Sequence, residues 1–151
     1  MSTHSTIAME QPDGRVMCVY AHWDGYLSNN GRILEESYQN RAKVLSLMLL
    51  GSISSLREKI GQPHDFSARY DDSDPRSHWT VAYGRDRGEN DTAATVFKDF
   101  ADYKAHHQYE EYEYIYRLDN LWYVSYDDRE YEPLAKALSQ RMEEMAEGFG
   151  D

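Results

Sequence analysis

The chain has 151 residues, a formal net charge of −11 at pH 7 and one cysteine. This length suits a single domain over residues 1–151, and a lone Cys18 excludes an internal disulfide and favours a reducing compartment. No stretch approaches the roughly 18 apolar residues of a membrane span, and the N-terminus lacks a signal-peptide pattern. We therefore expect a cytoplasmic protein with no membrane association.

The net negative charge comes from the second part of the chain. Residues 1–60 hold six acidic and six basic side chains, so the whole excess falls in residues 61–151. A field of this sign repels phosphate backbones, which disfavours direct nucleic-acid binding, and it attracts basic proteins through screened solvent. The same excess would also serve solubility alone, and composition does not separate the two interpretations.

The first predicted element is a β-hairpin with strands over residues 6–10 and 15–23, joined by a Pro-Asp-Gly turn. Neither face of the second strand is clearly polar, since alternation puts Val16 and Cys18 on one face and Val19 on the other. The strand should therefore be covered on both sides.

Helical patterns follow a tight turn at residues 24–25. Residues 28–30 are of the N-cap type and precede an apolar helical face over residues 33–38. Asn40 is the predicted N-cap of a second helix, which is apolar nearly all round and is closed by Gly51. We expect this helix to be buried against the sheet.

The middle of the chain is predicted to be irregular. Residues 52–60 form a short connection, and residues 61–76 form a long surface loop rich in aspartate. Alternation predicts a strand over residues 78–83, and residues 84–91 form a charged loop after it. A short strand is expected over residues 95–97.

The C-terminal part begins with a helix capped by Asp99. A second hairpin follows over residues 111–118 and 121–126, and a two-residue turn would set Tyr116 opposite Tyr123. The last helix is predicted to start at residues 132–133. The fold class is therefore α+β, with an antiparallel sheet of about five strands, from two hairpins plus one strand, packed with two to four helices.

One candidate for catalysis lies where the first hairpin ends. His22 stands two residues before Asp24 at the end of a strand, where an imidazole could act as a general base. Within the Arg85-Glu89 loop, Arg87 could orient an anionic substrate. This gives the alternative of a small enzyme with a site formed by His22, Asp24 and that loop. Turn chemistry and surface ion pairs explain the same residues, so no catalytic residue is assigned.

Metal and cofactor sites find little support in the sequence. No two histidines have the spacing of a helical zinc pair, and the segment after Asp72 lacks the later ligands of a calcium loop. Cys18 lies in mid-strand without a neighbouring cation, which is typical of an inert thiol. We expect no metal ion and no cofactor.

Tyrosines and acids are concentrated together near the C-terminus. Eight of the 13 tyrosines lie in residues 103–131, among many carboxylates. Rigid aromatic rings beside acids suit the gripping of a basic partner, although a half-buried sheet with a solvated rim has the same composition. The predicted partner-binding residues are Glu110, Glu111, Glu113, Asp127, Asp128, Glu130 and Glu132.

Several segments resemble a family of small phage and prophage accessory proteins of uncharacterised activity. The most specific are His-Trp-Asp-Gly-Tyr at residues 22–26 and Tyr-Gly-Arg-Asp-Arg-Gly-Glu at residues 83–89. The opening at residues 2–7 and the Gly-Ser-Ile-Ser-Ser-Leu segment at residues 51–56 add to the resemblance. The residues of these segments that we single out are Trp23, Tyr26, Arg85 and Glu89.

The resemblance implies that the protein acts in the cytoplasm of an infected bacterial host. It implies no particular activity, because none is established for the family. Small acidic phage proteins often block host machinery, and by analogy the partner here would be a basic host protein, such as a nucleic-acid-handling defence enzyme whose groove accepts an acidic decoy. The leading expectation is therefore an inhibitor of a bacterial defence system, of the anti-CRISPR kind. A structural phage component is a third interpretation, and the sequence does not fix the oligomeric state.

Overall fold

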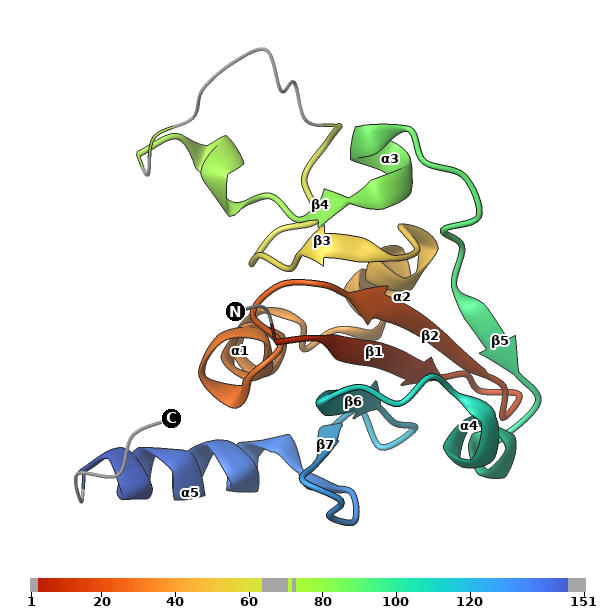
Figure 1. Ribbon diagram of the computed structural model, residues 1–151, viewed down its shortest axis with the longest axis vertical. Helices are drawn as coiled ribbons and strands as arrows, with labels where there is room; N and C mark the ends of the chain where they lie inside the picture. The colour runs from red at the N-terminus through yellow and green to blue at the C-terminus, as the bar shows by residue number, and fades with distance from the viewer. Residues whose placement is uncertain (1–2, 64–70, 72, 147–151) are drawn as a thin grey trace.

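A mixed β-sheet runs through the protein, and helices pack on both of its faces (Figure 1). The computed structural model describes residues 3–63, 71 and 73–146. Within these residues the sheet has eight strands. They are β1 (Ser5–Glu10), β2 (Val16–Ala21), β3 (Ile53–Ser55), β4 (Val81–Ala82), β5 (Thr95–Phe97), β6 (Tyr112–Tyr116), β7 (Trp122–Tyr126) and β8 (Glu132–Pro133).

The helical elements lie between these strands and after the last one. The α-helices are α1 (Arg32–Ser37), α2 (Arg41–Leu49), α3 (Tyr83–Arg87), α4 (Phe100–His106) and α5 (Leu134–Ala146). A π-helical turn, η1 (Leu27–Gly31), runs directly into α1, and a 3-10 turn, η2 (Pro75–His78), precedes β4.

The predicted α+β class is correct, but the predicted antiparallel sheet of about five strands is wrong. The strand order is β4-β3-β2-β1-β6-β7-β8, with β5 also paired to β2, and the pairs β1–β6 and β2–β3 are parallel. Parallel pairing of β1 with β6 joins Ser5 to Tyr112, which local sequence patterns cannot indicate. The strands β3, β4 and β8 have only two or three residues and so show no periodicity.

The two predicted hairpins are present, with a shift in the second. In β1–β2 the register pairs Ser5 with Ala21 and Glu10 with Val16. In β6–β7, Tyr116 pairs with Trp122 rather than Tyr123. The loop has three residues, 118–120, because Asn120 adopts a left-handed conformation (φ 62°) that closes a type I turn with a bulge. This one-residue slip points Trp122 into the main core.

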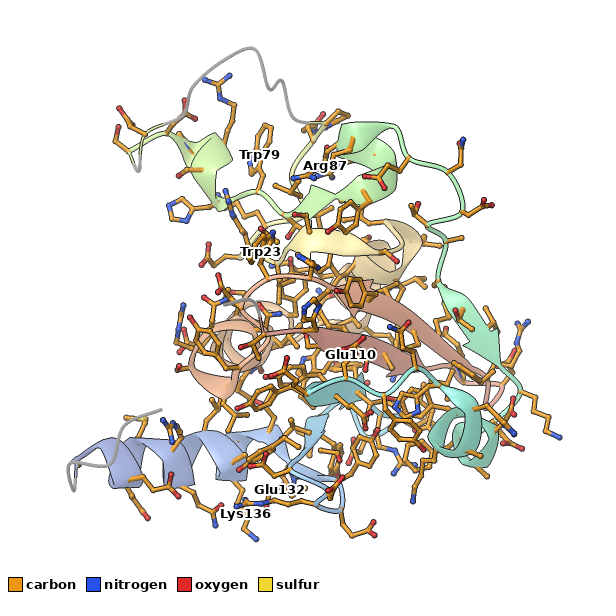
Figure 2. All side chains as sticks on the ribbon, in the orientation of Figure 1. Trp23, Trp79, Arg87, Glu110, Glu132 and Lys136 are labelled. Carbon is orange, nitrogen blue, oxygen red and sulfur yellow. The ribbon has the colours of Figure 1, made fainter. Side chains whose placement is uncertain are left out.

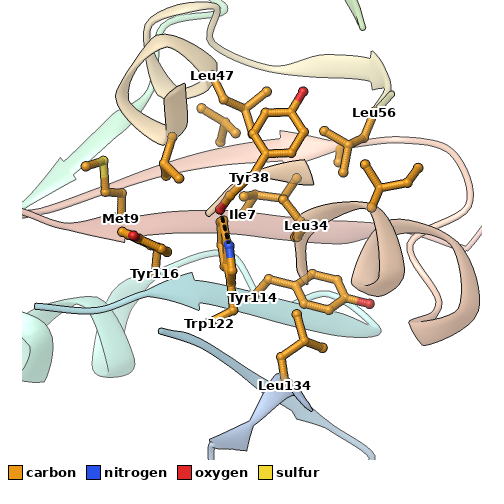
Figure 3. Packing of buried hydrophobic residues seen from close by; sticks show 14 of the residues in the cluster. Ile7, Met9, Leu34, Tyr38, Leu47, Leu56, Tyr114, Tyr116, Trp122 and Leu134 are labelled. Carbon is orange, nitrogen blue, oxygen red and sulfur yellow. Dashed lines mark hydrogen bonds between the residues drawn. The ribbon is translucent and has the colours of Figure 1, made fainter. Parts of the chain in front are cut away.

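The main core fills the space between the sheet and helices α1, α2 and α5 (Figure 3). Its largest buried side chains include Tyr38, Tyr114 and Tyr116, and the Trp122 indole N–H donates to the Tyr38 carbonyl at 2.8 Å. On the opposite face a smaller cluster, which includes Ala8, Val16, Cys18, Phe97, Tyr103 and Ile115, lies beneath α4. Aromatic rings are therefore buried on both faces of β6, and the candidate site is built at its N-terminal end.

Several local predictions need correction. The segment expected as a charged loop at residues 84–91 contains α3, and residues 52–60 contain β3 instead of an irregular connection. Helix α2 is capped by Asn40 as predicted but is not buried all round, since Leu49 is 71% exposed. Residues 132–133 pair as β8 before α5 begins. Of the predicted loop over residues 61–76, much lies outside the described residues.

Candidate functional site

A pocket of about 590 Å³ opens where β6 begins and β7 ends. Two loops form its walls: residues 107–111 lead from α4 into β6, and residues 127–131 lead from β7 towards β8. The antiparallel pairing of Tyr112 with Tyr126 brings these two loops together. We call this hollow the acidic pocket.

Six of the seven predicted partner-binding acids line the acidic pocket. They are Glu110, Glu111, Glu113, Asp127, Asp128 and Glu130. The basic side chains among the lining residues are Lys104, His107 and Arg129, so the pocket is strongly anionic. Glu132 is not among the lining residues; its carboxylate lies 4.0 Å from Arg129 near the start of α5 (Figure 2).

Tyrosines supply the apolar part of the pocket wall. The rings of Tyr112 and Tyr126 stack with centroids 5.4 Å apart, and Arg129 lies over the Tyr126 ring at 4.7 Å. Tyr109, which is 64% exposed, and Tyr131 also line the pocket. Flat rings held by stacking offer contact area to a ligand at little entropic cost.

The floor of the pocket is a buried hydrogen-bond network. The Nε2 atom of His107 lies 2.7 Å from the Glu113 carboxylate, and Tyr131 lies 3.2 Å from both that carboxylate and the Tyr103 hydroxyl. Burial raises the pKa values of the Tyr103 and Tyr131 phenols above their usual value, so both keep their protons at neutral pH. The Glu113 carboxylate is thus held inside the protein by His107 and Tyr131, and it supports the floor instead of facing a partner.

One rim of the pocket is a strained turn. Asp127 and Asp128 have φ values of 52° and 58°, and the N–H of Arg129 donates to the Tyr126 carbonyl at 3.0 Å. This is the geometry of a type I′ hairpin turn, in which both central residues are left-handed and Asn-Gly is preferred. Two adjacent aspartates place two carboxylates at the pocket mouth at some cost in backbone energy.

A second hollow of about 410 Å³ adjoins the first and extends towards α5. It shares five lining residues with the acidic pocket: Glu111, Tyr112, Tyr126, Asp127 and Arg129. Tyr26 and Glu144 line its far side. The stacked pair Tyr112 and Tyr126 thus forms a ridge between two hollows.

The alternative catalytic residues do not form a joint site. Among the described residues, no hydrogen bond or ion pair joins His22, Asp24 and Arg87 to one another. His22 contacts Tyr20, Asp24 lines a separate hollow of about 210 Å³, and Arg87 lies over the Tyr83 ring. The positive φ of Asp24 (56°) accompanies the turn of the chain after the strand.

The residues singled out by the resemblance have mainly structural contacts. Arg85 donates to the backbone carbonyls of Ile60, Gly61 and Thr80 and to the buried Asp86 carboxylate, so it fastens α3 to the preceding segments. Trp23 is 44% exposed. The Glu89 backbone N–H donates to the Tyr83 carbonyl and ends α3.

Sequence reasoning missed the role of His107. Its signal was its place four residues after Tyr103 on a short helix, with Glu113 in the next strand, but the contact depends on how residues 107–111 turn. Within the described ranges, no group of three or more His, Cys, Asp or Glu side chains is arranged to hold a metal ion. In the same residues, no helix has the length and apolar character to cross a bilayer.

Comparisons of the chain with protein-family models, with curated proteins and with solved structures gave no match.

Proposed function

We propose that this protein binds a basic protein of a bacterial host through the acidic pocket, and that it acts as a phage-type accessory protein inhibiting a defence system. The observation that carries this proposal is the convergence of five exposed or half-exposed carboxylates around one tyrosine-walled pocket. These are Glu110, Glu111, Asp127, Asp128 and Glu130.

Electrostatics supports a cationic ligand. Because Glu113 is buried against His107, the charge that a partner meets comes from the remaining five acids, against Lys104 and Arg129. A concave surface lined by one sign of charge concentrates its field and speeds association with a partner of the opposite sign. Such association weakens as salt increases.

The tyrosines favour a protein partner over simple counter-ions. Lysine and arginine side chains gain from contact with aromatic faces, and the guanidinium of Arg129 already lies in this way over Tyr126. Aromatic residues are also enriched in protein interfaces. Charge and stacking together therefore fit a surface rich in arginine or lysine.

The resemblance to phage accessory proteins supports a bacterial setting. There, enzymes that grip nucleic acid present basic grooves, and an acidic protein can occupy such a groove in place of the phosphate backbone. A nucleic-acid-handling defence enzyme is the partner class that this reasoning favours.

The test compares two variants with the same change in net charge. The pocket variant carries Glu111→Gln, Asp127→Asn and Glu130→Gln, and the control carries Glu36→Gln, Glu89→Gln and Glu143→Gln. All six side chains belong to exposed residues, and those of the control lie outside the acidic pocket. Each purified protein is immobilised, incubated with lysate of a defence-bearing bacterium at low salt and eluted with rising salt.

We expect the wild type and the control to retain the same basic protein and to release it at higher salt, and the pocket variant to lose it. In the same strain, expression of the wild type and the control should raise phage plating efficiency, whereas the pocket variant should not. Equal capture by all three proteins, or capture of nothing beyond background, would contradict the proposal.

A further inference from the structure

Three carboxylates of the acidic pocket are free to pair with a ligand. Asp127, Asp128 and Glu130 lie on one loop and are exposed, and their side chains make no hydrogen bond or ion pair with any residue in the described ranges. A carboxylate without an internal partner keeps all of its acceptor positions for a ligand. These three side chains therefore offer acceptors alone.

Four of the other polar side chains that line the pocket already have hydrogen-bond partners. The Ser125 hydroxyl donates to a backbone carbonyl of its own loop at 2.8 Å, and the Tyr131 hydroxyl belongs to the buried network of the floor. Both ring nitrogens of His107 face oxygen acceptors inside the protein. The Tyr109 hydroxyl donates to the carbonyl of Lys104. Acceptors and ring faces therefore dominate what a ligand meets, and a ligand rich in N–H donors fits them best.

Tyr109 is the most exposed of the tyrosines that line the pocket. It is 64% exposed, yet it is fixed at two points. Its hydroxyl is bonded to a backbone carbonyl of α4, and its ring packs against His107 with centroids 4.4 Å apart. The rings of Tyr112 and Tyr126 are less open, because they stack on each other and Arg129 lies over Tyr126. A flat ring that is already held in place loses little entropy when a ligand stacks on it.

The protein itself shows how an arginine packs at this pocket. The Arg129 guanidinium lies over the Tyr126 ring at 4.7 Å, donates to the Tyr126 hydroxyl at 2.9 Å and lies 4.0 Å from the Glu132 carboxylate. A ring face and a carboxylate thus accompany one guanidinium. The same two kinds of group stand on the two walls of the pocket, since Tyr109 belongs to residues 107–111 and the three free acids belong to residues 127–131.

We infer, resting on the proposed function, that the acidic pocket selects arginine over lysine in its protein partner, and that Tyr109 determines this specificity. A guanidinium is planar and has five N–H donors and no acceptor, so it can stack on Tyr109 while it pairs with a free carboxylate through two hydrogen bonds. A lysine ammonium is compact and more strongly hydrated, and it has no flat face to stack. Both cations gain from the negative field, so charge alone does not separate them.

The test uses two labelled peptides of equal charge, tetra-arginine and tetra-lysine, each acetylated and amidated at its ends. Their dissociation constants for the full chain are measured by fluorescence anisotropy at one low salt concentration. Tyr109→Leu keeps apolar bulk but removes the aromatic ring, and Tyr109→Phe keeps the ring but removes the hydrogen bond to α4. The pocket variant described above shows whether the peptides bind in the acidic pocket, and far-UV circular dichroism checks that each variant is folded.

We expect the wild type and Tyr109→Phe to bind tetra-arginine about fivefold more tightly than tetra-lysine. Tyr109→Leu should lose this preference and bind both peptides as the wild type binds tetra-lysine, and the pocket variant should bind both more weakly. Equal affinities of the two peptides for the wild type, an unchanged preference in Tyr109→Leu, or full binding by the pocket variant would overturn the inference.

The peptides contain no host protein, so the two proposals can fail separately. A preference for tetra-arginine that depends on Tyr109, without capture of a host protein from lysate, would support the arginine selectivity and contradict the proposed function. Capture of a host protein without any preference between the peptides would do the reverse.

Discussion

Both ring nitrogens of His107 face oxygen acceptors: Nδ1 lies 2.6 Å from the Tyr103 carbonyl and Nε2 lies 2.7 Å from the Glu113 carboxylate. Nδ1 must therefore carry a hydrogen that it donates to the carbonyl, and a second proton lies between Nε2 and Glu113. The pair is neutral as a whole, and the side chains of His107 and Glu113 are only 1% and 8% exposed. Neither ring nitrogen is available as a base for a substrate.

Replacing His107 by alanine should destabilise the protein by about 3 kcal/mol, because it leaves the Glu113 carboxylate buried without its cationic partner. The stacking of the His107 ring on Tyr103, at 4.2 Å, is lost as well. Urea denaturation measures the change. His106→Ala is the matched control, since that ring is exposed and paired with Asp102, and it should change stability little. Equal effects of the two substitutions would contradict a buried neutral pair.

The contacts of Arg85 lead to a second prediction about stability. Its guanidinium donates to the Ile60 and Thr80 carbonyls at 2.9 and 2.8 Å and to the Asp86 carboxylate, whose side chain is fully buried. Lysine keeps the charge but lacks the planar fork that reaches these acceptors together. Arg85→Lys should therefore cost about 3 kcal/mol of stability in urea denaturation.

Arg87→Lys provides the control for this prediction. Arg87 is exposed and lies over the Tyr83 ring at 5.4 Å, so its replacement should leave the denaturation midpoint nearly unchanged. If Arg85→Lys were as mild as Arg87→Lys, the segment at residues 60–61 would be held to α3 by other contacts.

The sequence could predict the features that depend on neighbouring residues. The Asn40 and Asp99 caps accept from backbone N–H groups three residues later, and the first hairpin has its expected partners. The parallel β1–β6 pair joins residues more than 100 positions apart, and β8 has two residues, so neither leaves a periodic pattern. Non-local pairing is what turned a predicted antiparallel sheet into a mixed one.

The candidate site also has one part that the sequence could predict and one that depends on tertiary contacts. Its acids could be predicted as a set because they lie close together in the sequence on two loops that flank one hairpin. Which of these acids are exposed in the pocket could not be predicted. The burial of Glu113 against His107 and the position of Glu132 near Arg129 both depend on tertiary packing. His22 and Asp24 are close in sequence, but they have different neighbours: His22 contacts Tyr20, whereas Asp24, which is itself left-handed, lines a separate hollow.

The raised pKa values of the buried tyrosines predict that the protein loses stability at alkaline pH. Burial raises the pKa of Tyr38 to about 12, and Tyr103, Tyr114 and Tyr131 are shifted in the same direction. An unfolded tyrosine loses its proton near pH 10, so the folded state binds more protons above that pH. The stabilising contribution is complete below about pH 10 and is lost as the pH rises towards 12.

Tyrosinate absorbance and circular dichroism measured together should show two phases. Exposed tyrosines should ionise with the native spectrum retained, and the buried ones should ionise only as the native signal is lost. Tyr38→Phe should reduce the dependence of stability on pH in this range. A single titration of all 13 tyrosines with the fold intact would contradict the prediction.

The turn at Asp127 and Asp128 predicts opposite effects on stability and binding. Glycine adopts positive φ without the steric cost of a side chain, so Asp128→Gly should raise stability by about 1 kcal/mol. The same change removes a carboxylate from the pocket mouth, so it should weaken capture of the basic partner.

Asp128→Asn is the matched control, because asparagine tolerates the left-handed conformation while losing the charge. It should leave thermal stability nearly unchanged and reduce capture as much as Asp128→Gly does. If Asp128→Gly were more stable and bound as well as the wild type, the strained carboxylate would have no role in recognition.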